Sequence, residues 1–570
     1  MQNFKKLISE KILETITANF SGAVLTTEEI ARMLEYPPDT TMGDIALPCF
    51  KLSKSLRRSP VQIAQTIADG LNDSSIKRAE AVNGYLNISI SDEYLNFVLT
   101  DEVLANGDKY GSATYGEGKT VVLDYSSPNV AKPFHIGHLG TTVIGHSLKK
   151  LHEFVGYNCV GINYLGDWGT QFGKMIVAYK KWGDREAINN GGIDKLVELY
   201  VKFHHAAEED KALEDEARAE FHKLELGDEE NISLWKWFIE ISIAEYKKTY
   251  AQLGIEFDSY KGESFYTDKM PAQVQKLRDM DLLKIDDGAS IVDLEQYNMP
   301  PCLILKRDGS TLYPTRDIAA AVYRKQTYDF DKAIYVTSAG QSLHFAQWFK
   351  VVELMKYDWH DKLVHVPYGT VSINGAKLAT RTGNVILLKD LFAQAIDKVT
   401  EIMEEKNPGL ENKDKVAEAV GVGAIVFYYL SSNRIRDINF VLEDALSFDG
   451  NTGPYVQYTY ARTCSLIEKA ENVELSNSIV FTSDDERELV KTLARFPEKV
   501  LEAIDSYEPS VVTRYILEVA TAFNRFYHNC HILSATDKDV LNTRIALTKA
   551  TNYVLGNAFE LICLKKTPKI

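Results

Sequence analysis

The chain has 570 residues, of which 45% are hydrophobic and 25% are charged, a usage typical of a globular protein with several cores. Its net charge of −16 excludes a protein that coats nucleic acid indiscriminately, although one specific nucleic-acid partner stays compatible with it. The sequence holds no uncharged apolar run of about 18 residues, which excludes a membrane-spanning helix and argues against a membrane partner.

The N-terminal segment is an amphipathic stretch interrupted by charges, with apolar residues at helical spacing at Ile8, Ile12 and Ile16. It lacks the continuous apolar core of a signal peptide, so we expect a cytoplasmic protein. The six cysteines are scattered without a CxxC pair, which argues against a disulfide framework and a cysteine zinc site.

The pattern of apolar residues differs between three regions of the chain, which predicts three domains. Residues 1–105 combine helical periodicity with a short strand near 85–90, which indicates a small α/β domain. Residues 106–395 alternate apolar strands with helices, the pattern of a parallel α/β sheet, and the charged helical stretch 184–250 indicates a helical insertion. Residues 396–570 are mainly helical and predict a bundle. The predicted strands of the sheet are 120–123, 159–164, 302–306, 332–336 and 363–367.

The segment Ser127-Pro-Asn-Val-Ala-Lys-Pro-Phe-His-Ile-Gly-His138 stands between a predicted buried strand and a predicted amphipathic helix. The start of a helix offers free N–H groups and partial positive charge, and the imidazoles of His135 and His138 can donate hydrogen bonds to phosphate. Gly137 lets a ligand approach the backbone closely. The segment therefore predicts a nucleotide site, while two surface histidines or a zinc site remain as alternatives.

The same segment resembles the HIGH region of class I aminoacyl-tRNA synthetases. Its Ser-Pro-Asn and Ala-Lys-Pro tripeptides are similar to those of the arginyl-tRNA synthetases. Further stretches resemble that family in order along essentially the whole chain: 163–173, 263–266, 313–317, Gln341 with His344, and 450–462. The resemblance implies a Rossmann-like catalytic domain with a helical insertion, an N-terminal tRNA-binding domain and a C-terminal anticodon-binding bundle.

The resemblance also implies the reaction. An arginine–tRNA ligase activates L-arginine with ATP to arginyl-adenylate, transfers it to the 3′ end of tRNA(Arg) and releases AMP and pyrophosphate. The expected partners are ATP, L-arginine, tRNA(Arg) and Mg²⁺, with no resident metal site in the protein and with a monomeric chain. Members of the family usually need bound tRNA before they activate the amino acid.

For ATP, the resemblance assigns His135, Gly137 and His138 at the helix start, and Lys132 just before it. The second ATP loop departs from the family's usual Lys-Met-Ser-Lys-Ser. Here Lys377 matches the first lysine, but Thr380 stands where the second is expected, followed by Arg381. The resemblance implies that Lys132 compensates for the missing lysine. On its own, this loop would be interpreted as an ordinary basic turn.

For arginine, the resemblance assigns Asn129, Glu263, Tyr313, Asp317 and Gln341. Carboxylates, hydrogen-bond acceptors and an aromatic ring are the groups that a guanidinium fork requires. Without the resemblance, Asp317 would be a first-turn acid that stabilises a helix dipole, and Glu263 a loop acid.

For tRNA, the resemblance places Tyr85 and Asn87 at a base of the D-loop, where an aromatic face can stack and an amide can pair. Tyr455, Tyr458 and Arg462 are spaced i, i+3 and i+7, which puts them on one helix face suited to the anticodon stem and loop. The alternatives are a core position for Tyr85 and a half-buried tyrosine stripe in the bundle.

Two other classes of protein remain open. The first is a synthetase for another amino acid, or a nucleotidyltransferase with the same type of sheet. The second is a non-catalytic tRNA-binding protein derived from a synthetase, which we would expect to have lost the histidines or the pocket acids.

Overall fold

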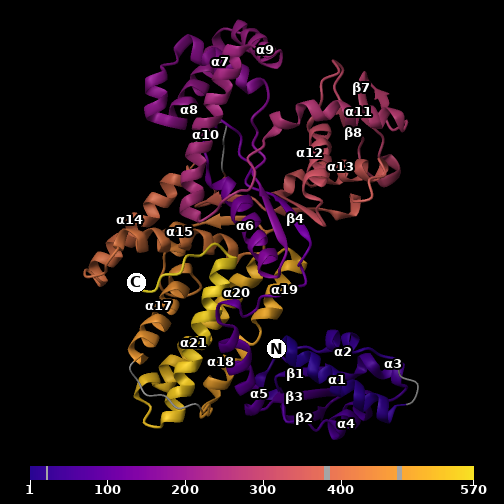
Figure 1. The fold of residues 1–570 in the computed structure, drawn as a ribbon, viewed down its shortest axis with the longest axis vertical. Helices are drawn as coiled ribbons and strands as arrows, with labels where there is room; N and C mark the ends of the chain where they lie inside the picture. Colours follow the sequence, from indigo (N-terminus) through magenta and orange to yellow (C-terminus); the bar gives the residue numbers. More distant parts are fainter. Residues whose placement is uncertain (21–23, 378–385, 472–477) are drawn as a thin grey trace.

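A computed structural model describes residues 1–20, 24–377, 386–471 and 478–570, and Figure 1 shows their arrangement. The N-terminal unit lies beside the C-terminal helices, and the inserted segments of the central region project from the opposite end of the molecule. Among the described residues, no helix has the length and apolar character needed to cross a membrane.

The N-terminal unit is a three-stranded antiparallel sheet with helices packed on it. The sheet has the order β1-β3-β2, and its central strand β3 confirms the predicted strand near 85–90. Leu86, Ile88 and Ile90 of β3 are buried, whereas Tyr85 and Asn87 lie on the other face. The elements are α1 (Gln2–Asn19), α2 (Thr27–Met33), β1 (Ile45–Pro48), α3 (Ser53–Leu56), α4 (Pro60–Gly70), β2 (Ile76–Val82), β3 (Tyr85–Ile90) and α5 (Asp92–Phe97).

The central sheet is parallel and has the order β10-β9-β4-β5. Its strands are β4 (Thr120–Asp124), β5 (Asn158–Ile162), β9 (Lys332–Ser338) and β10 (Leu363–Tyr368). Four of the five predicted strands are therefore confirmed. Helices α6 (Leu139–Phe154), α12 (Tyr313–Tyr328) and α13 (Ser342–Leu354) accompany the sheet.

The fifth predicted strand was assigned to the wrong sheet. Residues 302–305 do form a strand, β8 (Cys302–Leu305), but it belongs to an antiparallel sheet with β6 (Lys284–Asp286) and β7 (Ala289–Val292), next to α11 (Met270–Asp279). Cys302 and Ile304 are buried while Leu303 is 42% exposed, the alternation of a sheet with one solvated face. An apolar run of this length looks the same in either type of sheet, so the sequence could not tell them apart.

The predicted helical insertion is present and is longer than expected, because it also includes a helix at 170–182. It consists of α7 (Thr170–Trp182), α8 (Arg185–Glu209), α9 (Ala212–Glu225) and α10 (Glu229–Leu253). Gly192 bends α8 with a φ of 59°, a conformation that favours glycine. The last helix, α10, returns from the insertion to the central sheet (Figure 1).

The C-terminal region is the helical bundle that the sequence predicts. Its helices are α14 (Leu388–Lys406), α15 (Lys413–Ser431), α16 (Leu442–Ala445), α17 (Gly453–Ala470), α18 (Asp484–Leu493), α19 (Phe496–Ser506), α20 (Ser510–Cys530) and α21 (Lys538–Leu561). A small sheet joins it to the central region, since β11 (Val371–Ile373) pairs with β12 (Ala376–Lys377) and with β13 (Ile438–Phe440).

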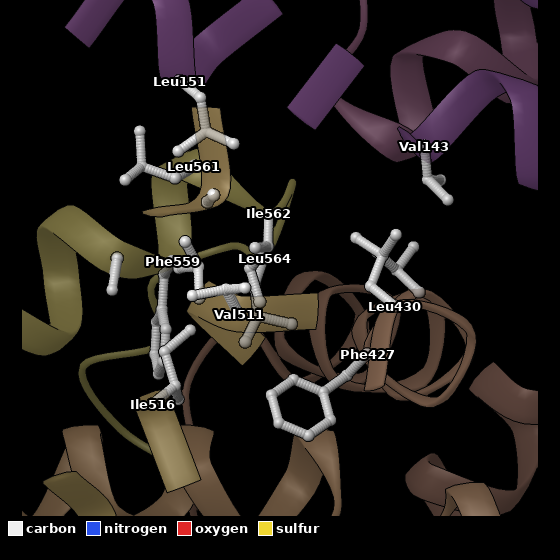
Figure 2. Packing of buried hydrophobic residues seen from close by; sticks show 14 of the residues in the cluster. Val143, Leu151, Phe427, Leu430, Val511, Ile516, Phe559, Leu561, Ile562 and Leu564 are labelled. Carbon is white, nitrogen blue, oxygen red and sulfur yellow. The ribbon is translucent and has the colours of Figure 1, made fainter. Parts of the chain in front are cut away.

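Helix α6 is enclosed between the parallel sheet and the bundle. Every residue from Leu139 to Leu148 is buried. Figure 2 shows its Val143 close to Leu430 of α15 and its Leu151 close to Leu561 of α21. The Ser147 hydroxyl donates to the backbone oxygen of Leu561 at 2.6 Å. The start of α6 is therefore held from both sides.

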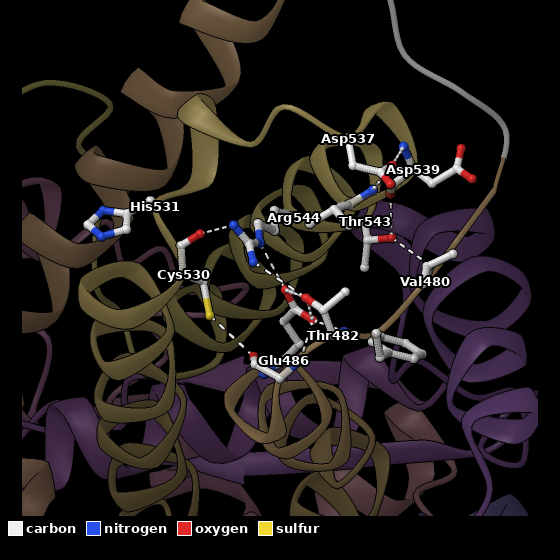
Figure 3. Close-up of polar contacts among 12 residues, drawn as sticks. Val480, Thr482, Glu486, Cys530, His531, Asp537, Asp539, Thr543 and Arg544 are labelled. Carbon is white, nitrogen blue, oxygen red and sulfur yellow. Dashed lines mark hydrogen bonds and ion pairs between the residues drawn. The ribbon is translucent and has the colours of Figure 1, made fainter.

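A buried ion pair closes one end of the bundle (Figure 3). Glu486 of α18 is fully buried and pairs with Arg544 of α21 at 2.9 Å. Its carboxylate also accepts the backbone N–H of Thr482 at 2.6 Å, and Arg544 donates to the carbonyl of Cys530 at the end of α20. Three helices therefore meet at one carboxylate.

We expect Glu486→Ala to lower the free energy of unfolding by about 3–5 kcal/mol, since it leaves the Arg544 guanidinium without its carboxylate. Urea denaturation followed by circular dichroism measures the loss. The matched control is Glu468→Ala in α17, whose 60% exposed side chain pairs with Lys569 at 3.2 Å and should contribute at most about 1 kcal/mol. Equal losses in the two variants would contradict the buried network.

The buried histidines of α6 should make the fold sensitive to acid. Burial lowers the pKa of His146 to about 3 and of His152 to about 4, against an ordinary value of 6.5. Below pH 6.5 the unfolded chain takes up protons that the folded chain does not. Above pH 6.5 these histidines therefore do not reduce the free energy of unfolding. As the pH drops toward 4, the free energy of unfolding falls by about 1.4 kcal/mol per pH unit for each histidine.

Urea midpoints measured between pH 8 and pH 5 check this dependence. His146→Gln should make it shallower. The control His222→Gln removes a histidine whose side chain is 69% exposed and should leave it unchanged. A pH dependence that is the same in all three proteins would refute the assignment to buried imidazoles.

Candidate active site

A cavity of about 620 Å³ lies at the carboxyl ends of the parallel strands, the usual place for a ligand in this type of sheet. Asp124 at the end of β4, Ser338 at the end of β9 and Tyr368 at the end of β10 line it. The structure brings six of the predicted site residues together on its walls: Asn129, His138, Glu263, Tyr313, Asp317 and Gln341.

Two acids form one wall of the cavity, and each already has a partner from the chain itself. Glu263 pairs with Arg316 at 2.5 Å. The carboxylate of Asp317 lies 2.6 Å from His344 Nε2. The Arg316 guanidinium also lies 5.6 Å from the centre of the Tyr313 ring, which is 65% exposed at the mouth of the cavity. Asp317 is thus a wall residue and not a helix cap.

Glu263 is held in place by the segment that resembles the family at 163–173. Its backbone N–H donates to the oxygen of Leu165 at 3.0 Å. The next residue, Ser264, donates through its N–H at 2.8 Å and its hydroxyl at 2.6 Å to the carboxylate of Asp167. The resemblance to the family includes this stretch but assigns no role to Asp167.

Burial raises the pKa of Glu263 to about 7, although the Arg316 guanidinium acts in the opposite direction. The neighbouring carboxylates of Asp317 and Asp167 add to the increase. A second guanidinium placed between Glu263 and Asp317 would remove that repulsion and favour the ionised carboxylate. The wall is therefore suited to a cationic ligand.

A second, fully buried ion pair forms the floor of the cavity, and sequence analysis missed it. Arg324 of α12 is 1% exposed and pairs with Asp124 at 2.8 Å. Its guanidinium lies 5.1 Å from the centre of the Tyr164 ring and 5.6 Å from that of Tyr335. The hydroxyls of both tyrosines are buried beside this guanidinium.

The position of Asp124 carried a signal that could have been used, because it ends a buried strand of a parallel sheet. Ser127, whose hydroxyl donates to the Asp124 carboxylate at 2.9 Å, follows it within the signature segment. Arg324 carried no such signal. It lies in the middle of a helix, and only the packing of α12 on β4 shows that it faces the cavity.

The two signature histidines form a 3₁₀ turn, Ile136–His138, directly before α6. His135 Nδ1 accepts the N–H of Gly137 at 3.1 Å, and His138 Nδ1 accepts the N–H of His135 at 3.2 Å. Each neutral ring therefore carries its proton on Nε2, which leaves a hydrogen-bond donor for a ligand. The Gly137 amide is therefore already bonded to the His135 ring within the turn.

Burial lowers the pKa of His138 to about 3 and also lowers that of His135. The positive charge of Lys132 contributes to both shifts. Both imidazoles are consequently neutral at pH 7. Lys132, His135 and Gly137 do not line the cavity, and the Lys132 side chain is exposed.

The second ATP loop can be placed only at its ends. Lys377 is the last residue of β12, with its Cα opposite Ser372 of β11, while Thr380 and Arg381 lie outside the described residues. Beyond them, Leu388 donates its N–H to the oxygen of Phe134 at 2.9 Å, and Leu387 forms an antiparallel bridge with His135. The far end of this loop is thus bonded to the histidine turn.

The predicted tRNA residues lie outside the cavity. Tyr85 is 36% exposed on β3, with its ring centre 5.7 Å from that of Phe50. Tyr455, Tyr458 and Arg462 share one face of α17, as the spacing predicts. The Arg462 guanidinium lies 5.1 Å from the centre of the Tyr458 ring.

Asn524 of α20 connects the other members of this face, because it accepts from Arg462 at 2.5 Å and donates to the Tyr455 hydroxyl at 2.9 Å.

Within the part of the chain that the structure describes, no three His, Cys, Asp or Glu side chains are grouped to hold a metal ion.

Known proteins resemble this chain in each region. A family model described as "tRNA synthetases class I (R), catalytic domain" matches residues 99–442. Models of an "Arginyl tRNA synthetase N terminal domain" and a "DALR anticodon binding domain" match residues 2–90 and 456–570. The arginine–tRNA ligases of Alkaliphilus metalliredigens and Clostridium perfringens are each 49% identical, with 100% of both chains covered.

Two solved structures share the fold over almost the whole chain. The arginyl-tRNA synthetase of Thermus thermophilus matches with a TM-score of 0.83 and 23% identity, covering 99% of this chain and 100% of its own. That of Plasmodium falciparum matches with a TM-score of 0.80 and 24% identity, covering 99% and 98%. Family models in all three regions and full-length relatives at 49% identity lead to one conclusion: the chain belongs to the arginyl-tRNA synthetase family.

Proposed function

We propose that this chain works as an arginine–tRNA ligase and that arginine meets ATP in the cavity at the carboxyl ends of β4, β5, β9 and β10. The observation that carries the proposal is the distribution of charge around this cavity. Glu263 and Asp317 form an acidic wall, and the neutral His138 lines the same space. No observation favours the alternative of a non-catalytic tRNA-binding protein.

The acidic wall would receive the guanidinium of arginine. Asp317 and Glu263 provide carboxylate oxygens, and the Tyr313 ring provides a face at the mouth of the cavity. A substrate without the guanidinium fork, such as lysine, would leave part of these buried acceptors unpaired. Discrimination against lysine then follows from desolvated acceptors more than from size.

The opposite end of arginine would be held by Asn129 and Gln341. Asn129 lies against Gly166, and a Cβ at Gly166 would come within 2.1 Å of the Asn129 amide oxygen. Only glycine at this position allows the Asn129 side chain to take its place on the cavity wall.

ATP would bind with its phosphates at the histidine turn. Nε2–H groups of His135 and His138 can donate to phosphate oxygens, and Lys132 can neutralise the charge that grows on the α-phosphate during attack. We assign Gly137, Lys377 and Arg381 to the same nucleotide. Mg²⁺ would arrive on the ATP phosphates and not in a cage of protein ligands.

For tRNA(Arg), we propose the D-loop at Tyr85 and Asn87 and the anticodon at Tyr455, Tyr458 and Arg462. The corresponding division of the chain is 1–105, 106–395 and 396–570. The exposed rings of Tyr85 and Tyr458, and the Arg462 guanidinium beside Tyr458, support the assignment, because unstacked bases bind through stacking and charge. We further propose a cytoplasmic protein that acts as a monomer.

Asp317→Asn should lower kcat/KM for arginine roughly 100-fold, because the uncharged amide cannot balance a buried guanidinium. The KM for ATP should stay close to that of the unmodified protein. Steady-state aminoacylation with varied arginine and varied ATP separates the two effects. Asp329→Asn at the other end of α12, with a side chain 91% exposed, is the matched control. An unchanged kcat/KM for arginine would remove Asp317 from the site.

Arginine-dependent exchange of pyrophosphate into ATP should be weak without tRNA(Arg) and strong with it. The exchange assay is run with no tRNA, with tRNA(Arg) and, as the control, with a tRNA for another amino acid. The same protein should charge tRNA(Arg) with arginine and with none of the other standard amino acids. Full exchange without tRNA would contradict the expected dependence, and charging with another amino acid would contradict the proposed substrate.

A further inference from the structure

One face of α10, the last helix of the insertion, runs along the signature segment and bonds to it repeatedly. Ser242 Oγ accepts the N–H of Ala131 at 3.1 Å. Four residues on, the Tyr246 hydroxyl lies 2.8 Å from the carbonyl oxygens of both Asn129 and Lys132, so its single proton is shared between them. The spacing of four places both side chains on the same face of the helix.

The next turn of α10 continues this face. The Tyr250 hydroxyl lies 2.8 Å from the Ser126 hydroxyl and accepts from the Asn163 amide at 2.9 Å. Tyr246 is fully buried and Tyr250 is 1% exposed. These bonds are therefore made in a medium of low polarity, where losing a partner is costly.

The segment that α10 holds has an unfavourable backbone. Ser126, Ser127 and Ala131 all take positive φ values, of 69°, 48° and 59°. Residues with a side chain rarely adopt this conformation and keep it only where the surrounding structure imposes it. The bonds from α10 reach the segment at Ser126 and Ala131, two of these three residues.

The rings of the same tyrosines also reach an ATP histidine. Phe134 is stacked on the His138 imidazole, with ring centres 5.0 Å apart and planes inclined by 9°. On its other sides, Phe134 contacts Tyr246 at 5.5 Å and Tyr250 at 5.6 Å between ring centres. The orientation of His138 thus depends on α10 through one intervening ring.

The beginning of α10 touches the segment that supports Glu263. Trp235 Nε1 donates to the backbone oxygen of Asp167 at 2.7 Å, and the Asp167 carboxylate holds Ser264, the neighbour of Glu263. One helix therefore contacts the segment that presents Asn129, Lys132 and His138 directly, and reaches Glu263 through Asp167. None of these contacts can be inferred from the spacing of residues in the sequence.

We propose that α10 is the positioning helix of this active site and that Ser242 and Tyr246 are positioning residues for adenylate formation. They touch neither ATP nor arginine and act by fixing the backbone from Asn129 to Lys132. The inference rests on the proposed function, because it concerns the alignment of the two substrates in the same cavity. A misplacement of about 1 Å in such a segment can lower the rate about 100-fold.

The test uses the full-length variants Tyr246→Phe and Ser242→Ala, which remove one hydroxyl each without adding bulk. Both should lower kcat for tRNA-dependent pyrophosphate exchange by roughly 10–100-fold and leave the KM for tRNA(Arg) within about twofold. Tyr179→Phe, in the same insertion but with its ring against Trp237 and Phe238, is the matched control and should keep its rate.

A second measurement does not depend on activity. Amide hydrogen exchange at Ala131 should be faster in Ser242→Ala than in the unmodified protein, and unchanged in Tyr179→Phe. Variants with unaltered kcat, or a loss that appears only in the KM for tRNA, would overturn the proposal. Failure of the unmodified protein to use arginine would instead overturn the proposed function, so the two outcomes are distinguishable.

Discussion

The burial of α6 between the parallel sheet and the helical bundle is the constraint on which the active site depends. Its first ten residues have no exposed face, and Thr141 links it to β9 by donating to the oxygen of Val336 at 2.7 Å. The histidine turn precedes this immobile helix directly. A flexible helix start would let His135 and His138 move relative to the sheet, and neutral donors are useful to phosphate only when they are fixed.

Two carboxylates of the cavity are paired with arginines of the chain itself before any substrate enters. Arg316 faces Glu263, and Arg324 faces Asp124. Such buried pairs contribute little net stability, because desolvation offsets most of their attraction. Their main effect is to fix the position of each carboxylate relative to the cavity.

Local patterns in the sequence predicted a large part of the fold. The periodicity of α1, the alternation in β3 and the buried strands β4, β5, β9 and β10 follow from which residues avoid water. The pairing of β8 did not follow, because a four-residue apolar run satisfies parallel and antiparallel neighbours equally. Six predicted site residues do line one cavity, and they were found through motifs whose residues are near one another in the chain.

The sequence by itself therefore determined the family, the order of the domains and the side chains that carry charge and hydrogen bonds at the site. Tertiary structure decided how these groups are held: by Arg324 from the middle of α12, by Asp167 beneath Glu263, and by Ser242 and Tyr246 from an inserted helix more than 100 residues away. The physical reason is that hydrogen bonds and ion pairs depend on distance in space. Periodicity reports only which face of an element is buried, and it carries no information on what will lie against that face.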